Sequence, residues 1–167
     1  MSAIQRILPL ALLCVFAIPA GAQISPAPVA QSPVAGFSIT KPDEPHWQNV
    51  PGGRGVKLAN IFGDPSKPGV YVVRVWFPPH VMDLPHFHSE DRHVTVIKGT
   101  WCAGTGAIFD PSKATRLKAG SYMFHPAKAI HWDGAATDED AIVQIIGVGP
   151  VATTQTHGPG SDWVEAK

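Results

Sequence analysis

The sequence has 167 residues, in which 13 Lys and Arg residues balance 13 Asp and Glu residues. Zero net charge without any basic run argues against nucleic acid or an acidic membrane surface as the partner, because both require clustered positive charge. The 16 Gly and 17 Pro residues leave little room for long helices, since each one weakens or breaks a helix interior. An apolar content of 44% is enough for one core. We therefore expect a turn-rich, all-β protein.

The first 22 residues have the pattern of a secretory signal peptide. Arg6 supplies a positive charge, residues 7–18 form an apolar run, and residues 19–22 include the small residues that precede a cleavage site. The apolar run is short for crossing a bilayer, so a retained transmembrane anchor is the less favoured alternative. The sequence predicts an exported protein, periplasmic or secreted, with no stable membrane insertion after cleavage.

The rest of the chain divides into an arm, one domain and a tail. Residues 23–45 contain five prolines and are predicted to form an extended arm or linker. Residues 46–155 should form the domain, and residues 156–167 a C-terminal tail. Short apolar runs separated by turn signals predict strands. They lie at residues 56–62, 70–77, 94–97, 107–109, 116–117, 121–124 and 141–148. Cys102, in an apolar stretch, is predicted to be a packed residue.

Four histidines suggest a metal site. His86 and His88 are two residues apart, which on a strand places both side chains on the same face. His93 opens the next apolar run, and His131 follows far downstream after a turn. Zinc, iron, copper, nickel and manganese all accept imidazole ligands. The two neighbouring histidines alone are weak support for a metal, so the longer pattern decides.

That longer pattern resembles the two motifs of the cupin superfamily. The first resemblance is His86-x-His88, four residues, His93, five residues and Gly99, and the second is Gly120, five residues, Pro126, four residues and His131. It spans residues 56–150 and implies a single cupin domain, a jelly-roll type antiparallel β-barrel. The stretch is similar to small exported single-cupin proteins. The resemblance further implies one divalent metal ion held by His86, His88, His93 and His131, a small-molecule ligand or substrate, and a homodimer.

Two positions depart from the family pattern. The usual Glu of the first motif is His93 here, and the usual Gly of the second motif is Lys128. Four neutral imidazoles would leave the double charge of the ion uncompensated, so an anionic or enolate ligand is expected. Such a site suits iron, zinc, copper or nickel better than manganese. Two alternatives stay open: three histidine ligands with His93 beside them, or no metal.

Two polar residues are candidates for catalysis. His125 lies at the end of a predicted strand, where it could line the cavity mouth as a substrate contact or an acid or base. Gln144 shares one strand face with Ile142 and Ile146, and it would orient a bound ligand if that face lines the cavity. The alternative for Gln144 is a solvated outer face.

Three further residues are candidates for substrate binding. Arg74 would clamp a carboxylate if its side chain points inward, although an outward orientation is favoured. Trp132 follows His131 directly and is the best candidate for a cavity wall. Phe124 is expected in the core or at the cavity rim.

Three functions remain open. The favoured one is a metal-dependent enzyme, dioxygenase-like, acting on a small chelating organic molecule. A zinc-type hydrolase, lyase or isomerase is an alternative, although no separate base is evident in the sequence. The third is a secreted binding protein for a metal or ligand, without turnover.

Overall fold

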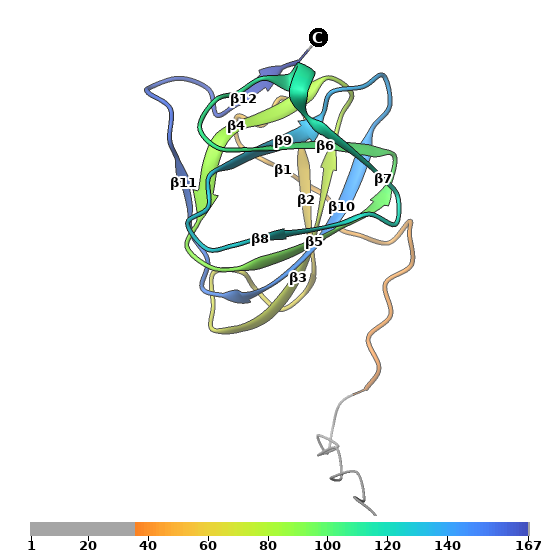
Figure 1. The fold of residues 1–167 in the computed structure, drawn as a ribbon. Helices are drawn as coiled ribbons and strands as arrows, with labels where there is room; N and C mark the ends of the chain where they lie inside the picture. Colours follow the sequence, from red (N-terminus) through yellow and green to blue (C-terminus); the bar gives the residue numbers. More distant parts are fainter. Residues whose placement is uncertain (1–35, 167) are drawn as a thin grey trace, which may run out of the picture. The chain divides into compact units, whose positions relative to one another are not determined.

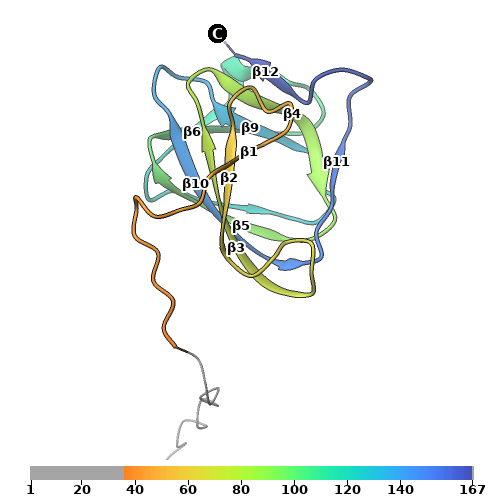
Figure 2. The ribbon, with the colours of Figure 1, turned by 180° about the vertical axis from the view of Figure 1, so that it is seen from behind.

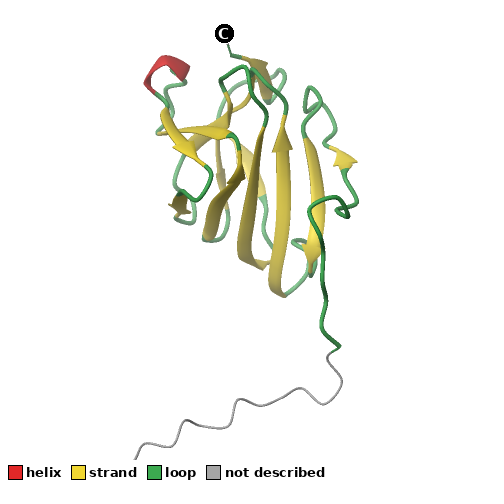
Figure 3. Cartoon of the chain, turned by 90° about the vertical axis from the view of Figure 1, so that its right-hand side faces the viewer, coloured by secondary structure: helices red, strands yellow, loops and turns green. Residues whose placement is uncertain are grey.

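The computed structural model describes residues 36–166, so the expected signal peptide and most of the expected arm lie outside the described residues. Twelve strands and one short 3₁₀-helix, η1, make up the regular structure of this part (Figure 3). Their bounds are β1 Gln48–Asn49, β2 Lys57–Phe62, β3 Gly69–Phe77, β4 Val81–His88, β5 Arg92–Lys98, β6 Thr100–Thr105, η1 Pro111–Lys113, β7 Thr115–Lys118, β8 Tyr122–His125, β9 His131–Ala135, β10 Ala141–Gly149, β11 Thr153–Gln155 and β12 Trp163–Glu165. Residues 36–166 include no helix long and apolar enough to cross a membrane.

The strands form two antiparallel sheets (Figure 1). Sheet A has the order β1-β2-β3-β10-β5-β8, and sheet B has the order β11-β4-β9-β6-β7, with β12 also paired to β4. Figure 2 shows β2, β3 and β10 of sheet A from behind. From β3 onward the chain passes repeatedly between the two sheets, and strands far apart in the sequence pair with each other, such as β3 with β10 and β4 with β9. The predicted all-β, jelly-roll type fold is confirmed.

Alternation of side chains decides which face of each strand is buried. In β3, Tyr71, Val73 and Val75 are buried, whereas the residues between them are only partly buried. β10 follows the same rule, with Val143 and Ile145 inside. A period of two places such residues on one face of the sheet. The apolar inner faces of both sheets, including Trp101 and Ala103 of β6, form the main core.

A second, smaller cluster covers the outer face of sheet B. It contains Met82, Cys102, Trp132 and Ala166, with Phe109 packed against it. The buried, free thiol of Cys102 confirms the expected packed role. The C-terminal tail contributes Ala166, and β12 pairs with residues 81–83 of β4. The tail is therefore part of the packed barrel.

One predicted strand is wrong. Residues 107–109 are not a strand, because β6 ends at Thr105 and Gly106 has a φ of 88°. A positive φ leaves the extended conformation that a strand needs. Phe109 instead folds back onto Trp132, with their ring centroids 5.2 Å apart. Six strands have no counterpart in the predicted apolar runs: β1, β4, β6, β9, β11 and β12.

Candidate metal centre

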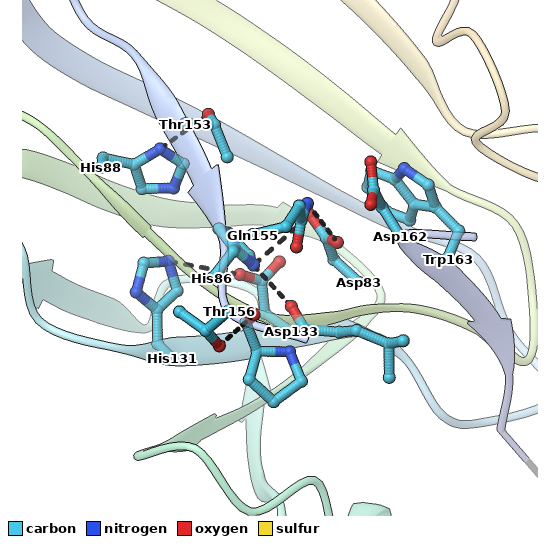
Figure 4. Close-up of polar contacts among 12 residues, drawn as sticks. Asp83, His86, His88, His131, Asp133, Thr153, Gln155, Thr156, Asp162 and Trp163 are labelled. Atoms are coloured by element: carbon cyan, nitrogen blue, oxygen red, sulfur yellow. Dashed lines mark hydrogen bonds and ion pairs between the residues drawn. The ribbon is translucent and has the colours of Figure 1, made fainter. Parts of the chain in front are cut away.

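Three histidines converge inside the barrel. His86 and His88 extend from β4, and His131 opens β9, directly opposite His86 in the strand register. One ligand nitrogen from each lies within 4.8 Å of the others. All three side chains are almost fully buried. Figure 4 shows the three imidazole rings side by side.

Hydrogen bonds orient the rings of His86 and His131. Nδ1 of His86 donates to the carbonyl oxygen of Leu84 at 2.8 Å, and Nδ1 of His131 donates to that of Ala129 at 2.9 Å. A carbonyl can only accept, so Nδ1 of each neutral ring carries the proton and Nε2 keeps its lone pair. Nδ1 of His88 lies 3.0 Å from the hydroxyl oxygen of Thr153, a group that can accept in the same way. This anchoring is the arrangement that metal-bound histidines require.

Burial keeps these imidazoles neutral. It lowers the pKa of His86 and of His88, and lowers that of His131 to about 4. The Arg92 charge and the neighbouring histidines lower the pKa of His88 further. Nε2 of His88 and of His131 is buried without a hydrogen-bond partner among the described residues. Buried, neutral nitrogens without partners fit a bound metal ion, because they are the ligand form of imidazole.

Two carboxylates lie next to the histidines. Asp83 of β4 and Asp133 of β9 face each other across the strand pair, and Asp83 Oδ2 lies 3.5 Å from Nδ1 of His86 (Figure 4). Burial, followed by the charge of Asp133, raises the pKa of Asp83 to about 8. Nε1 of Trp101 donates to Asp133 Oδ1 at 3.2 Å. Asp83 supports the ring of His86 from behind, whereas Asp133 Oδ2 lies 3.9 Å from Nε2 of His131, on the side of the ligand nitrogens.

The expected fourth ligand, His93, lies outside this group. Its side chain is exposed on the outer face of β5, where Nδ1 lies 2.7 Å from the hydroxyl oxygen of Tyr122. The reason is register: Val94 and Val96 point into the core, so His93 points outward. The expected four-histidine set is corrected to three converging histidines. The alternative with His93 beside the three ligands is wrong in its placement of His93, which lies on the outer face.

Arg92 occupies the inward position that was assigned to His93. It alternates with Val94 and Val96, and its Nε is buried without a partner among the described residues. The sequence reasoning missed Arg92, although counting back by two from the apolar Val96 and Val94 points to it. Tyr71, inward on β3 with a buried and unpartnered hydroxyl, was missed as well. Its alternation with Val73 and Val75 is the signal that could have found it.

His125 lies against the metal group from sheet A. Its ring centroid is 3.9 Å from that of His131 and 5.8 Å from that of Trp101. Arg92 Nη2 lies 3.4 Å from Nδ1 of His125, and arginine can only donate. The proton of the neutral ring is then on Nε2, which makes His125 a hydrogen-bond donor, although ligand atoms of His125, His131 and Asp133 also lie within 4.8 Å of one another. Burial lowers the pKa of His125 to about 2, which keeps the ring neutral.

Gln144 and Arg74 point away from the three histidines. Both are partly buried on the outer face of sheet A, where Arg74 Nε donates to Gln144 Oε1 at 3.2 Å. Val143 and Ile145 take the inward positions of β10. The expected cavity role of Gln144 is therefore corrected, and the outward orientation favoured for Arg74 is confirmed.

Phe124 and Trp132 also face away from the three histidines. Phe124 is 42% exposed and contacts the ring of His93, with centroids 5.3 Å apart. Trp132 points to the opposite side of β9 from His131, into the outer cluster of sheet B. The structure thus corrects the expectation that Trp132 forms a wall of the metal cavity. It packs over Gly104, where an added Cβ would lie 2.0 Å from the indole.

Solved structures share this architecture. The polyketide cyclase RemF from Streptomyces resistomycificus has a TM-score of 0.64 at 12% identity, covering 75% of this chain and 89% of its own. The DMSP lyase DddQ from Ruegeria pomeroyi DSS-3 has a TM-score of 0.55 at 15% identity, covering 70% and 63%. KdgF from Halomonas sp. has a TM-score of 0.53 at 20% identity, covering 70% and 96%. At these identities the likeness shows the fold alone.

The sequence comparisons place the chain in a family. Curated proteins give no significant match. The model of the ChrR cupin-like domain matches residues 36–152, a range that contains both sheets from β1 to β10 and all three converging histidines. The chain belongs to the ChrR cupin-like domain family.

Proposed function

We propose that this protein is a metal-dependent cupin enzyme that acts on a small, anionic and chelating organic molecule. In this proposal His86, His88 and His131 hold one divalent transition metal ion. One observation carries it: three buried imidazoles converge, two of them with Nδ1 bonded to a backbone carbonyl and two with an unpartnered Nε2. Such nitrogens match metal ligands in identity and orientation.

The charges of the site support an anionic substrate. Three neutral imidazoles leave the double charge of the ion in place, and Arg92 adds a positive charge on the opposite sheet, so the neighbouring Asp133 carboxylate offsets only part of the positive charge. Iron, zinc, copper and nickel suit such nitrogen ligands better than manganese does. A bound ion of this kind acts as a Lewis acid, polarising an oxygen of the substrate.

The remaining side chains of the site suit more than one class of reaction. His125 presents an Nε2–H donor beside His131, and burial of the site keeps bulk water away. These features serve dioxygenase-like oxidation of a chelated substrate, as expected from the sequence. They serve equally the lyase and cyclase chemistry stated in the names of DddQ and RemF.

A binding protein without turnover is the second candidate. The side chains of His86, His88 and His131 are only 2–4% exposed, which favours tight holding of an ion over exchange of substrate. Exchangeable water on the metal would favour the enzyme. An ion that no added chelating acid can reach would favour the binding protein.

Metal analysis of untagged protein tests the site. We expect about one ion per chain in the wild type and little metal in His88→Ala and His131→Ala, because each variant removes a ligand. His93→Ala is the matched control, since His93 is an exposed histidine of the same domain. It should keep its metal. Equal metal contents in His88→Ala and His93→Ala would overturn the proposal.

Activity is tested with the metal-loaded protein. Oxygen uptake and product formation are measured with diketones, catechols and 2-oxo or 2-hydroxy acids. Uptake of oxygen that depends on His88 would support the dioxygenase, and product without oxygen uptake would support a lyase or isomerase. Binding without product in any reaction would favour the second candidate.

We also propose that the protein is exported. The support is the apolar run at residues 7–18, with Arg6 before it and small residues after it. A mature chain beginning at Gln23, found in the periplasm or medium by fractionation and N-terminal sequencing, is the expected result. A cell-associated chain that keeps residues 1–22 would contradict it. Homodimer formation stays a prediction.

A further inference from the structure

Four inward positions form one row across sheet A. The strand register pairs Tyr71 of β3 with Gly147 of β10, Gly147 with Arg92 of β5, and Arg92 with His125 of β8. Neighbouring strands lie about 5 Å apart, so these positions follow one another across the inner face. We call Tyr71, Arg92 and His125 the donor row. The converging histidines all come from sheet B, which faces it.

Each member of the donor row carries a buried polar atom without a partner. They are the hydroxyl oxygen of Tyr71, Nε of Arg92 and Nε2 of His125. Tyrosine and arginine donate from these atoms, and so does His125 in the tautomer set by Arg92. Buried donors are nearly always satisfied in folded proteins. Three unsatisfied donors in one row point to a missing acceptor.

Gly147 leaves room for this arrangement. A Cβ at position 147 would lie 2.5 Å from the hydroxyl oxygen of Tyr71 and 2.7 Å from Cζ of its ring. The Tyr71 side chain therefore crosses β10 above Gly147, in the direction of Arg92. Any larger residue at this position would displace the Tyr71 hydroxyl from the row.

Arg92 has no carboxylate in direct contact, although the carboxylates of Asp133 and Asp83 attract its charge from farther away. Among the described residues its side chain contacts His125 and forms no ion pair with a carboxylate. A positive charge taken partly out of water without an anion is unfavourable. Arg92 is only partly buried as a residue, so an anion can reach it from solvent. A bound anion would satisfy both the charge and the free donors.

The donor row is adjacent to the candidate metal centre. His125 joins the two, since its ring centroid lies 3.9 Å from that of His131 and its Nδ1 lies 3.4 Å from Arg92 Nη2. A ligand that contacts both sheets is therefore small. Its two binding groups must be next to each other in the molecule.

We infer that the donor row is a carboxylate-binding subsite, and that the substrate is a short acid with an oxygen donor beside its carboxylate, a 2-oxo or 2-hydroxy acid. Arg92 and Tyr71 bind the carboxylate, and His125 donates to the same ligand. The adjacent oxygen is left for the metal. The role of the adjacent oxygen rests on the proposed function, because that oxygen would bind the metal ion. The role of the carboxylate does not, because the donor row binds a carboxylate with or without metal.

Calorimetric titration of the full chain with pyruvate tests the inference, with pyruvamide as the neutral counterpart. We expect Arg92→Met to weaken pyruvate binding about 10- to 100-fold, the range for hydrogen bonds to a charged group. Arg74→Met is the matched control, an arginine on the outer face of the same sheet, and it should bind pyruvate like the wild type. Pyruvamide should bind weakly to all three proteins.

Two further measurements distinguish a failure of the carboxylate-binding subsite from a failure of the proposed metal site. Metal content should be unchanged in Arg92→Met, whereas loss of metal in His88→Ala concerns the proposed function alone. Acetate is titrated into metal-stripped protein, where the same dependence on Arg92 is expected. Arg92→Lys, which keeps the charge, covers the case in which Arg92→Met does not fold, and it should bind pyruvate more weakly than the wild type. Equal binding by the Arg92 and Arg74 variants, equal binding of pyruvamide, or no pyruvate binding by the wild type would overturn the inference.

Discussion

The two faces of sheet A carry the same kinds of side chain in opposite settings. An arginine, a histidine and a tyrosine point into the barrel, and another of each points outward. The inner set is Arg92, His125 and Tyr71, and the outer set is Arg74, His93 and Tyr122. The residue types are the same, so their surroundings alone distinguish the two sets.

The outer side chains bond to one another or to neighbours. Arg74 donates to Gln144, and His93 lies 2.7 Å from the hydroxyl oxygen of Tyr122. Tyr71 and His125 are buried and Arg92 is partly buried, and each keeps a buried polar atom without a partner among the described residues. Water can replace a lost partner outside but not inside. Buried atoms without a partner occur elsewhere in the described residues too, on Trp132 and Gln155 for example, so the inner face differs in having three of them in one row beside the three histidines.

The largest effect should come from removing the space that the inner face needs. Gly147→Ala places a methyl group 2.5 Å from the hydroxyl oxygen of Tyr71, inside a packed barrel. We expect the free energy of unfolding to fall by about 1–3 kcal/mol, as for other overpacked cores. Urea denaturation monitored by tryptophan fluorescence measures it.

Gly158→Ala is the control for the change of residue itself, because nothing lies within 4 Å of a Cβ at position 158. Its free energy of unfolding should stay within about 0.5 kcal/mol of the wild type. If both variants unfold alike, Tyr71 does not need the space above Gly147, and the arrangement of the donor row is wrong.

A paired tyrosine substitution sharpens the comparison, because the two faces predict opposite signs. Tyr71→Phe removes a buried hydroxyl that has no partner, so the ligand-free protein should be unchanged or stabilised by up to about 1 kcal/mol. Tyr122→Phe removes the exposed contact with His93 and should destabilise by up to about 1 kcal/mol. Denaturation without ligand measures both.

Pyruvate titration of the same two variants adds a second readout. Binding should weaken in Tyr71→Phe and stay unchanged in Tyr122→Phe, since only Tyr71 belongs to the donor row. Destabilisation by Tyr71→Phe would mean that its hydroxyl has a structural partner, contrary to the comparison.

The sequence was sufficient for the fold and for three histidines. Alternation in Val70–Phe77 and Ala141–Val148, together with the cupin spacing, predicted the central strands and placed His86 and His88 on one face. The spacing did not show whether the side chain of residue 92 or that of residue 93 points into the barrel. A shift of one residue exchanges the two faces of a strand, so Arg92 and His93 changed roles.

Other parts of the site depend on contacts between distant segments. Asp83 and Asp133 are 50 residues apart, and only the pairing of β4 with β9 makes them neighbours. Tyr71 becomes notable only because Gly147 lies opposite it. Trp132 was misplaced for the same reason as His93, since it follows the inward His131 and must face the other way.

The smallest effect concerns a charged pair on the outer face. Asp140 accepts a hydrogen bond from Nε1 of Trp76 at 2.7 Å and lies 2.9 Å from Nζ of Lys98. Lys98 and then Trp76 hold the pKa of Asp140 below its ordinary value of 3.8. The folded protein thus binds fewer protons here than the unfolded chain. The stabilisation is fully present above a pH of about 4 and is lost as the pH falls through the folded pKa.

Asp140→Asn should therefore lower the free energy of unfolding at pH 7 by less than about 1 kcal/mol, because water and salt screen an outer pair. The difference from the wild type should shrink between pH 5 and pH 3, and added salt should reduce it at pH 7. Urea midpoints across that range measure it. If the difference in the free energy of unfolding stays constant with pH, it comes from the shape of the side chain and not from the charge of Asp140. A difference of several kcal/mol in the free energy of unfolding would show that a polar contact on the outer face matters as much for stability as packing on the inner face. The contrast between the two faces would then be wrong.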